Sequence, residues 1–189
     1  MNRFAKGSIA GAAGILLLLS GAGTFALWNG SASAAAGAVK SGTMTIAADP
    51  TPGAWSVVHG TGASTPIANI ANFRAVPGDV LTFTQKVDVV ATGDNLSAIL
   101  SVDSTSIKPG DASPASTALV TALTSSMTVS VPSGVTAGTA ANTFNVSPSA
   151  GTQVLTVSVQ LPFDTGTSGT LAQGGTVNLA ALGFNLQQQ

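Results

Sequence analysis

The sequence has no cysteine, no tyrosine and no glutamate, and its 189 residues include only one histidine. The absence of cysteine excludes a disulfide framework, thiol catalysis and a cysteine-based metal site. A Ser-His-Asp triad would have to use His59, and no Gly-x-Ser-x-Gly motif accompanies it. Zinc hydrolysis needs several His or carboxylate ligands and a general base. We therefore expect no enzyme activity and no cofactor, while a calcium ion at Asp94 or Asp111 stays an open alternative.

Charged residues are also scarce, at 7% of the chain, and the formal net charge is −1. This composition leaves no basic patch for nucleic acid. Little repulsion opposes self-association at so low a net charge.

The chain is instead rich in Ala, Ser, Thr and Val, with 22 Gly, and hydrophobic residues reach 44%. That hydrophobic fraction is enough to bury a core, so intrinsic disorder is not expected. Small and β-branched side chains favour pleated sheet over helix, because Val and Thr lose rotamer freedom on a helix. The composition predicts an all-β protein of one domain.

The first 26 residues have the pattern of a secretory signal peptide. Arg3 and Lys6 precede an apolar run, and no further charge occurs before Lys40. An uncleaved membrane anchor is the alternative, because about 20 apolar residues would span a bilayer. The preferred cleavage site lies after Ala26, which makes Leu27 the first mature residue. The small-x-small rule of signal peptidases also permits cleavage after Ala34 or Ala36.

Alternating apolar residues predict a series of strands after this segment. Turns rich in Gly, Pro and Asp separate them, and a Ser-Pro pair at the start of a helical pattern predicts one short helix over residues 114–123. About eight strands are expected, over residues 42–48, 54–59, 80–91, 96–103, 127–131, about 142–147, 152–161 and 176–187. We expect the pair 80–91 and 96–103 to form a hairpin, and the last strand to carry a bulge near Ala181. The set predicts a two-sheet antiparallel β-sandwich.

Four short motifs in order resemble the TasA/camelysin family of exported bacterial proteins. They are Gly-Thr-Phe-Ala-Leu-Trp-Asn at 23–29, Ser-Gly-Thr-Met-Thr-Ile at 41–46, Val-Pro-Gly-Asp-Val-Leu at 76–81 and Phe-Asn-Leu at 184–186. The resemblance implies a jelly-roll-like sandwich, cleavage after Ala26 by a dedicated signal peptidase, and assembly into extracellular biofilm fibres. In that family an extended amino terminus completes the sheet of a neighbouring subunit.

The expected organisation is therefore a signal peptide over residues 1–26, an extended donor segment over 27–41 and a sandwich over 42–189. Leu27, Trp28 and Val39 are the residues expected to anchor the donor segment in the next subunit. Three alternatives remain: a donor segment that is only a flexible spacer, a monomeric surface adhesin or carbohydrate-binding sandwich, and a secreted metalloprotease. We expect a secreted homopolymer that meets the membrane only through its uncleaved signal.

Overall fold

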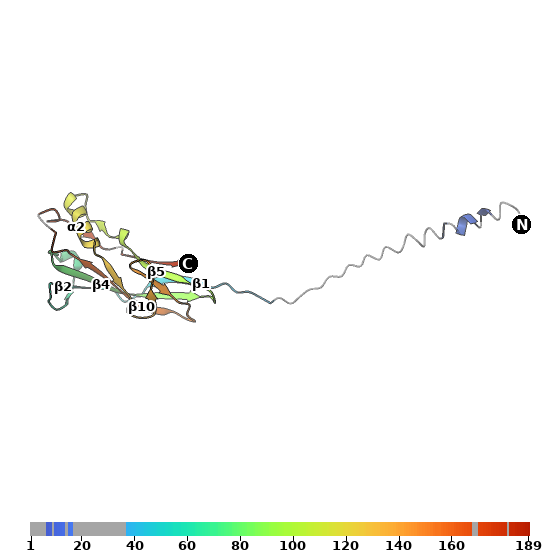
Figure 1. The fold of residues 1–189 in the computed structure, drawn as a ribbon, viewed down its shortest axis with the longest axis horizontal. Coiled ribbons are helices and arrows are strands. Elements are labelled where there is room, and N and C mark those ends of the chain that lie inside the picture. Colours follow the sequence, from blue (N-terminus) through green and yellow to red (C-terminus); the bar gives the residue numbers. More distant parts are fainter. Residues whose placement is uncertain (1–6, 9, 14, 17–36, 168–169, 181) are drawn as a thin grey trace. The chain divides into compact units, whose positions relative to one another are not determined.

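The computed structural model describes residues 7–8, 10–13, 15–16, 37–167, 170–180 and 182–189. The chain divides into two units, Met1–Val39 and Lys40–Gln189. In the first unit the described residues before position 17 are helical. Among all described residues, no helix is long and apolar enough to cross a membrane. The second unit contains the strands (Figure 1).

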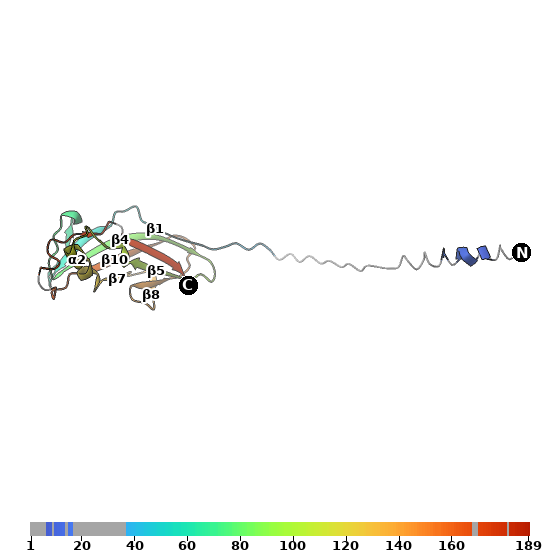
Figure 2. The ribbon, with the colours of Figure 1, turned by 90° about the horizontal axis from the view of Figure 1, so that it is seen from above.

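The larger sheet of the second unit has six antiparallel strands in the described residues. Its order is β3-β2-β4-β10-β7, and β1 pairs with β4 as well. The bounds are β1 (Thr43–Ala48), β2 (Ala54–His59), β3 (Thr65–Ile67), β4 (Asp79–Thr92), β7 (Thr128–Ser130) and β10 (Gln153–Pro162). Because β4 is the longest strand, it carries partners along both of its edges (Figure 2).

Strands β1 and β2 share one edge of β4, where β2 pairs with its first half and β1 with its second half. The loop between them, residues 49–53, lies opposite Gln85 and Lys86. The buried Gln85 amide donates to the carbonyl oxygens of Thr51 at 3.0 Å and Lys86 at 2.8 Å. Gly53 lies so close to the Phe83 ring that a Cβ there would overlap it. Together these contacts make β1 and β2 one interrupted row of the sheet.

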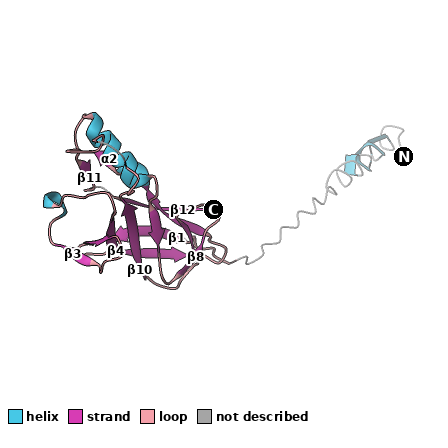
Figure 3. Cartoon of the chain, turned by 60° about the vertical axis from the view of Figure 1, so that its left-hand side comes forward, coloured by secondary structure: helices cyan, strands magenta, loops and turns pink. Residues whose placement is uncertain are grey.

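The smaller sheet has four strands in the described residues, in the order β12-β5-β9-β8. Their bounds are β5 (Ala98–Asp103), β8 (Val135–Ala137), β9 (Thr143–Val146) and β12 (Gly183–Gln188). Two-residue strands β6 (Lys108–Pro109) and β11 (Val177–Asn178) form a further pair, and η1 (Ile70–Asn72) and η2 (Ser104–Ser106) are single 3₁₀ turns. Figure 3 shows β11 beside the helix α2 (Pro114–Thr124).

The hydrophobic core lies between the two sheets and under α2. Its most deeply buried side chains come from β4, β5, β9 and β10: Val87, Val89, Leu100, Val146, Val157, Val159 and Leu161. Burial of each is worth about 1.5–3 kcal/mol. The helix begins at the Ser113 cap, whose hydroxyl accepts from the Ser116 amide, and buries Leu123 in the core.

The predicted all-β, two-sheet antiparallel sandwich is confirmed, as is the helix, which runs one residue past the expected end. The predicted hairpin is wrong, because β4 and β5 belong to different sheets and the turn between them carries the chain across the core. The single closing strand over 176–187 is also wrong. It is two strands, β11 and β12, in different sheets, and the expected bulge at Ala181 lies outside the described residues.

Candidate assembly site

Of the four residues predicted for cleavage and assembly, the structure describes one. Ala26, Leu27 and Trp28 lie outside the described residues. Val39 is described, and its side chain is 98% exposed. Residues 37–42 are all exposed and have no regular secondary structure. The stretch that directly precedes β1 is therefore a run of exposed backbone.

The start of β1 is fixed by close contact with the end of β4. A Cβ at Gly42 would overlap the carbonyl oxygen of Thr92, so the backbone there passes closer than any other residue allows. The Thr43 amide then donates to the Thr92 hydroxyl at 2.8 Å. These contacts determine where the preceding segment joins the sandwich.

The outer edge of β1 is open. The Asp49 amide donates to the Lys86 carbonyl at 2.9 Å, and the antiparallel register continues from there along β1. Hydrogen bonding alternates along an antiparallel strand. The backbone amide and carbonyl groups of Thr43, Thr45 and Ala47 therefore face β4. The amide and carbonyl groups of Met44, Ile46 and Ala48 face away from it, and within the described residues these groups have no hydrogen bond.

The edge of β12 is open in the same way. The Gln189 amide donates to the Ser97 carbonyl at 2.8 Å. By the same alternation the backbone of Phe184, Leu186 and Gln188 faces away from β5. Phe184 and Leu186 are half-buried against the core, as are Met44 and Ile46 on β1. β1 and β12 approach each other (Figure 3). Two open edges and four half-buried apolar side chains therefore lie on the same side of the sandwich.

The edge of β3 is blocked by a proline. Trp55 and Val57 of β2 pair with Ile67 and Thr65, which leaves Pro66 with its backbone nitrogen on the outer edge. Proline has no amide hydrogen to offer to an added strand. This edge therefore resists strand addition.

An asparagine side chain caps the edge of β7, and a second asparagine bonds one carbonyl of β8. The Asn142 carbonyl accepts from the Val129 amide at 2.8 Å, and its amide nitrogen donates to the Met127 carbonyl at 3.1 Å. It thus occupies the outer edge of β7 as a neighbouring strand would. On β8 the Asn145 amide donates to the Ala137 carbonyl at 3.1 Å. Sequence reasoning missed these contacts, because nothing in the local pattern of an Asn marks a partner 13 residues away.

His59 is bonded to Asp79, a pairing that sequence reasoning also missed. The His59 Nδ1 lies 2.8 Å from Asp79 Oδ1, where the first residue of β4 meets the last of β2. The other carboxylate oxygen accepts from the Val76 amide at 2.8 Å. The imidazole side chain is 66% exposed, and within the described residues no hydroxyl is hydrogen-bonded to it. The contact closes the turn at residues 76–79.

Four of the scattered Asp residues occupy turns, as their positions predict. In each, a carboxylate oxygen accepts from the backbone amide two residues ahead: Asp49, Asp103, Asp111 and Asp164. Hydrogen bonds from Thr51 and Thr105 lower the pKa of Asp49 and Asp103, respectively. Hydrogen bonding by Ser113 and then Ser116 lowers the pKa of Asp111 to about 2.

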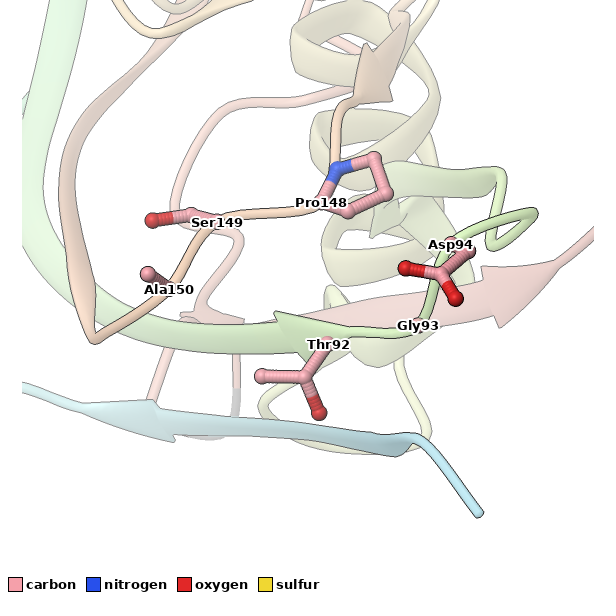
Figure 4. A pocket seen from close by; sticks show the side chains of 6 residues that line it. All are labelled: Thr92, Gly93, Asp94, Pro148, Ser149 and Ala150. Carbon is pink, nitrogen blue, oxygen red and sulfur yellow. The ribbon is translucent and has the colours of Figure 1, made fainter. Parts of the chain in front are cut away.

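Concave sites on the described surface are shallow. One lies at the turn after β4 and is lined by Thr92, Gly93, Asp94, Pro148, Ser149 and Ala150 (Figure 4). A second lies beside β3 and is mainly apolar. Asp94 is the one ionisable side chain of the first site, whereas calcium takes six to eight oxygen ligands. In the described residues no group of three or more His or Asp side chains could hold a metal ion.

Trp55, close to His59, is the aromatic side chain that a carbohydrate-binding surface would use. Trp55 is half-buried, and its ring lies 4.9 Å from that of Phe83, tilted by 37°. Such a pair is typical of packing within a core.

Comparison with known proteins adds no relative. No family model, no curated protein and no solved structure matches the chain. What the chain does must therefore be argued from its own edges and surfaces.

Proposed function

We propose that the chain is a secreted structural subunit of an extracellular filament, in which the segment preceding β1 adds as a strand to the sheet of another copy. The proposal covers residues 27–41 as donor, with Leu27, Trp28 and Val39 as its apolar anchors. Export with cleavage after Ala26 by a dedicated signal peptidase is part of it.

The observation that supports this function best is the exposed, unpaired run of residues 37–42 leading into a strand with an open outer edge. An open edge exposes a row of unpaired backbone groups that another chain can pair with. Main-chain hydrogen bonds then provide affinity, and alternate side chains fill pockets. Since the two surfaces are different, each added copy presents a new edge, so the contact propagates.

The composition favours the same function. The signal segment takes Arg3 and Lys6 with it, which leaves four basic residues against seven Asp, a net charge of −3. So small a charge opposes stacking of copies only weakly. The chain also has no cysteine, so disulfide bonds cannot join the subunits. Pairing of strands from neighbouring subunits would hold the filament together.

The test compares three purified chains by sedimentation and negative-stain electron microscopy. The chain beginning at Leu27 should form filaments. The chain beginning at Ser41 should stay monomeric while unfolding at about the same temperature, because the sandwich keeps its own core. Filaments from this truncated chain would refute the proposal.

The third chain separates a donor strand from a flexible spacer. It replaces residues 29–38 with a Gly-Ser sequence of equal length, which keeps the reach but not the strand-forming side chains. A donor strand predicts loss of filaments, and a spacer predicts their retention. Glycan binding by a chain that stays monomeric would instead favour the adhesin.

A further inference from the structure

In the larger sheet no strand lies beside the outer edge of β1 among the described residues, and we propose that this vacancy receives the donor segment of the next copy. This inference rests on the proposed filament function and names its acceptor. On one edge of β4 the neighbouring strands lie in rows, and the first row consists of β1 and β2, end to end. The second row holds β3, which pairs with β2 only. Nothing in the described residues pairs with the outer edge of β1, so the second row is empty there.

The vacancy has the size and chemistry of a strand. It runs along the six residues of β1, about 20 Å at 3.4 Å per residue. The backbone groups of Met44, Ile46 and Ala48 would pair with the incoming chain. The side chains of Met44 and Ile46 are half-buried and point to the core side, where Phe184 and Leu186 of β12 are also half-buried. An added strand would cover the apolar surface that these four leave accessible.

The other edges favour this position by exclusion. Pro66 blocks β3, Asn142 caps β7, and β8 is only three residues long, with its Ala137 carbonyl bonded by Asn145. The long open edges of the two main sheets among the described residues are therefore the six-residue strands β1 and β12. β1 is the better acceptor, because a strand there extends a row that β3 has already begun.

The donor sequence has a matching face. In an extended chain, alternate residues point to the same side. From Trp28 to Ala38 the even-numbered residues are all apolar or small: Trp28, Gly30, Ala32, Ala34, Ala36 and Ala38. The odd-numbered side carries the polar residues Asn29, Ser31 and Ser33 together with Leu27 and Val39. Of the three proposed anchors, Trp28 is therefore the one that lies on the even side. The even side therefore faces the core of the next copy, and its alanines suit the narrow space where β1 approaches β12.

The length also suffices. Residues 27–40 span about 46–50 Å when extended, at about 3.3–3.6 Å per residue. Six residues fill the vacancy, and the remaining eight, about 26–29 Å, connect the two copies.

The absence of cysteine allows a cross-linking test without background. Two single-cysteine chains, both beginning at Leu27, are mixed, assembled and oxidised. One carries the cysteine in the donor, as Ala32→Cys, Ala34→Cys or Ala36→Cys, so that several registers are sampled. The other carries it on an acceptor edge, as Ala48→Cys on β1. Gln188→Cys on β12 and Thr128→Cys on the capped β7 are the matched controls, and all three acceptor positions are exposed.

We expect at least one donor variant to give about tenfold more disulfide-linked heterodimer with Ala48→Cys than with Thr128→Cys. A thiol held in the complex has a millimolar effective concentration, whereas free chains meet at micromolar concentration. Mixing separate chains ensures that the cross-link joins two copies rather than a segment folded back on its own β1.

The outcomes separate the acceptor from the filament. Filaments whose cross-links form at Gln188→Cys, or equally at all three positions, overturn the β1 acceptor and leave the filament function standing. The absence of both filaments and cross-links overturns both. As a second measurement, Ala48→Pro removes one outward amide hydrogen and keeps the bonds of β1 to β4. It should abolish filaments and leave the monomer folded, and normal filaments from this variant would also overturn the inference.

Discussion

Asn142 gives the sharpest test of how the sandwich closes its edges, because its backbone and its side chain contribute separately. Its φ of 59° is left-handed, a conformation that disfavours most side chains. Its side-chain amide makes two hydrogen bonds to the edge of β7. Asn142→Gly removes the amide but adopts the same backbone freely. Asn142→Ala removes the amide and also places an unfavourable Cβ in the left-handed region.

The magnitudes follow from these two contributions. Two hydrogen bonds of about 0.5–1.5 kcal/mol each give a loss of about 1–3 kcal/mol for Asn142→Gly. Asn142→Ala adds about 1–2 kcal/mol of left-handed strain. The lower flexibility of the unfolded Ala chain offsets roughly 0.5–1 kcal/mol of that strain. The Ala variant should therefore be less stable than the Gly variant by roughly 0–1.5 kcal/mol, and by about 0.75 kcal/mol at the midpoints of the two ranges.

Urea unfolding followed by circular dichroism measures both differences. Asn95→Gly, at an exposed turn, is the matched control and should change the midpoint little. An Ala variant as stable as the Gly variant would refute the backbone argument. Two variants as stable as the unmodified protein would refute the edge cap itself. Light scattering gives a second readout, because an uncapped β7 edge should increase association of the Gly variant.

Two further predictions concern the core and the dependence of stability on pH. Gly53→Ala should destabilise the sandwich by about 1–3 kcal/mol, because the new Cβ overlaps the Phe83 ring. Phe83→Leu should relieve part of this overlap. In urea unfolding the double mutant should therefore be more stable than the sum of the two single changes predicts. The pKa of Asp111 is lowered to about 2 from an ordinary 3.8, so its ionised carboxylate stabilises the folded state. This stabilisation is fully present above about pH 4 and is lost as the pH falls toward 2. Asp111→Asn should therefore show a smaller fall in its urea midpoint between pH 4.5 and 2.5 than the unmodified protein, and an equal fall would contradict the assignment.

The strands that the sequence predicts best are those with one fully buried face. In β10 the alternate residues Leu155, Val157, Val159 and Leu161 are all buried, and β4 follows the same pattern through Gln85. The Ser113 cap and the proline after it place the start of α2 correctly. In these elements the local chemistry and the tertiary packing require the same conformation.

Sequence period alone could not assign strands to sheets. The inward residues Ala98, Leu100 and Val102 of β5 would alternate in the same way whether the strand paired with β4 or faced it across the core. The phase slip near residue 181 was a real signal, but it marks the passage from β11 to β12 rather than a bulge. Three-residue strands such as β3 and β8 are too short to show a period.

The candidate assembly site also has a part that the sequence predicts and a part that it does not. The strand at Thr43–Ala48 follows from the alternation of polar and apolar residues, whereas the exposure of Val39 comes from the structure. Which edges stay open depends on side chains that reach across the fold, as Asn142 does to β7. Such contacts exist only once the sheets have formed, so a local reading of the sequence does not contain them.

The junction at Gly42 has a mechanical consequence. Force applied to the chain before Gly42 enters the sandwich through β1, whose six residues pair with β4 along their whole length. When that force points along the strand, the hydrogen bonds of the pair are loaded in shear and must yield together. A force across the strand would open them one after another, beginning at Thr43. A single-molecule pulling measurement through the amino terminus should therefore find the sandwich much stronger along β1 than across it.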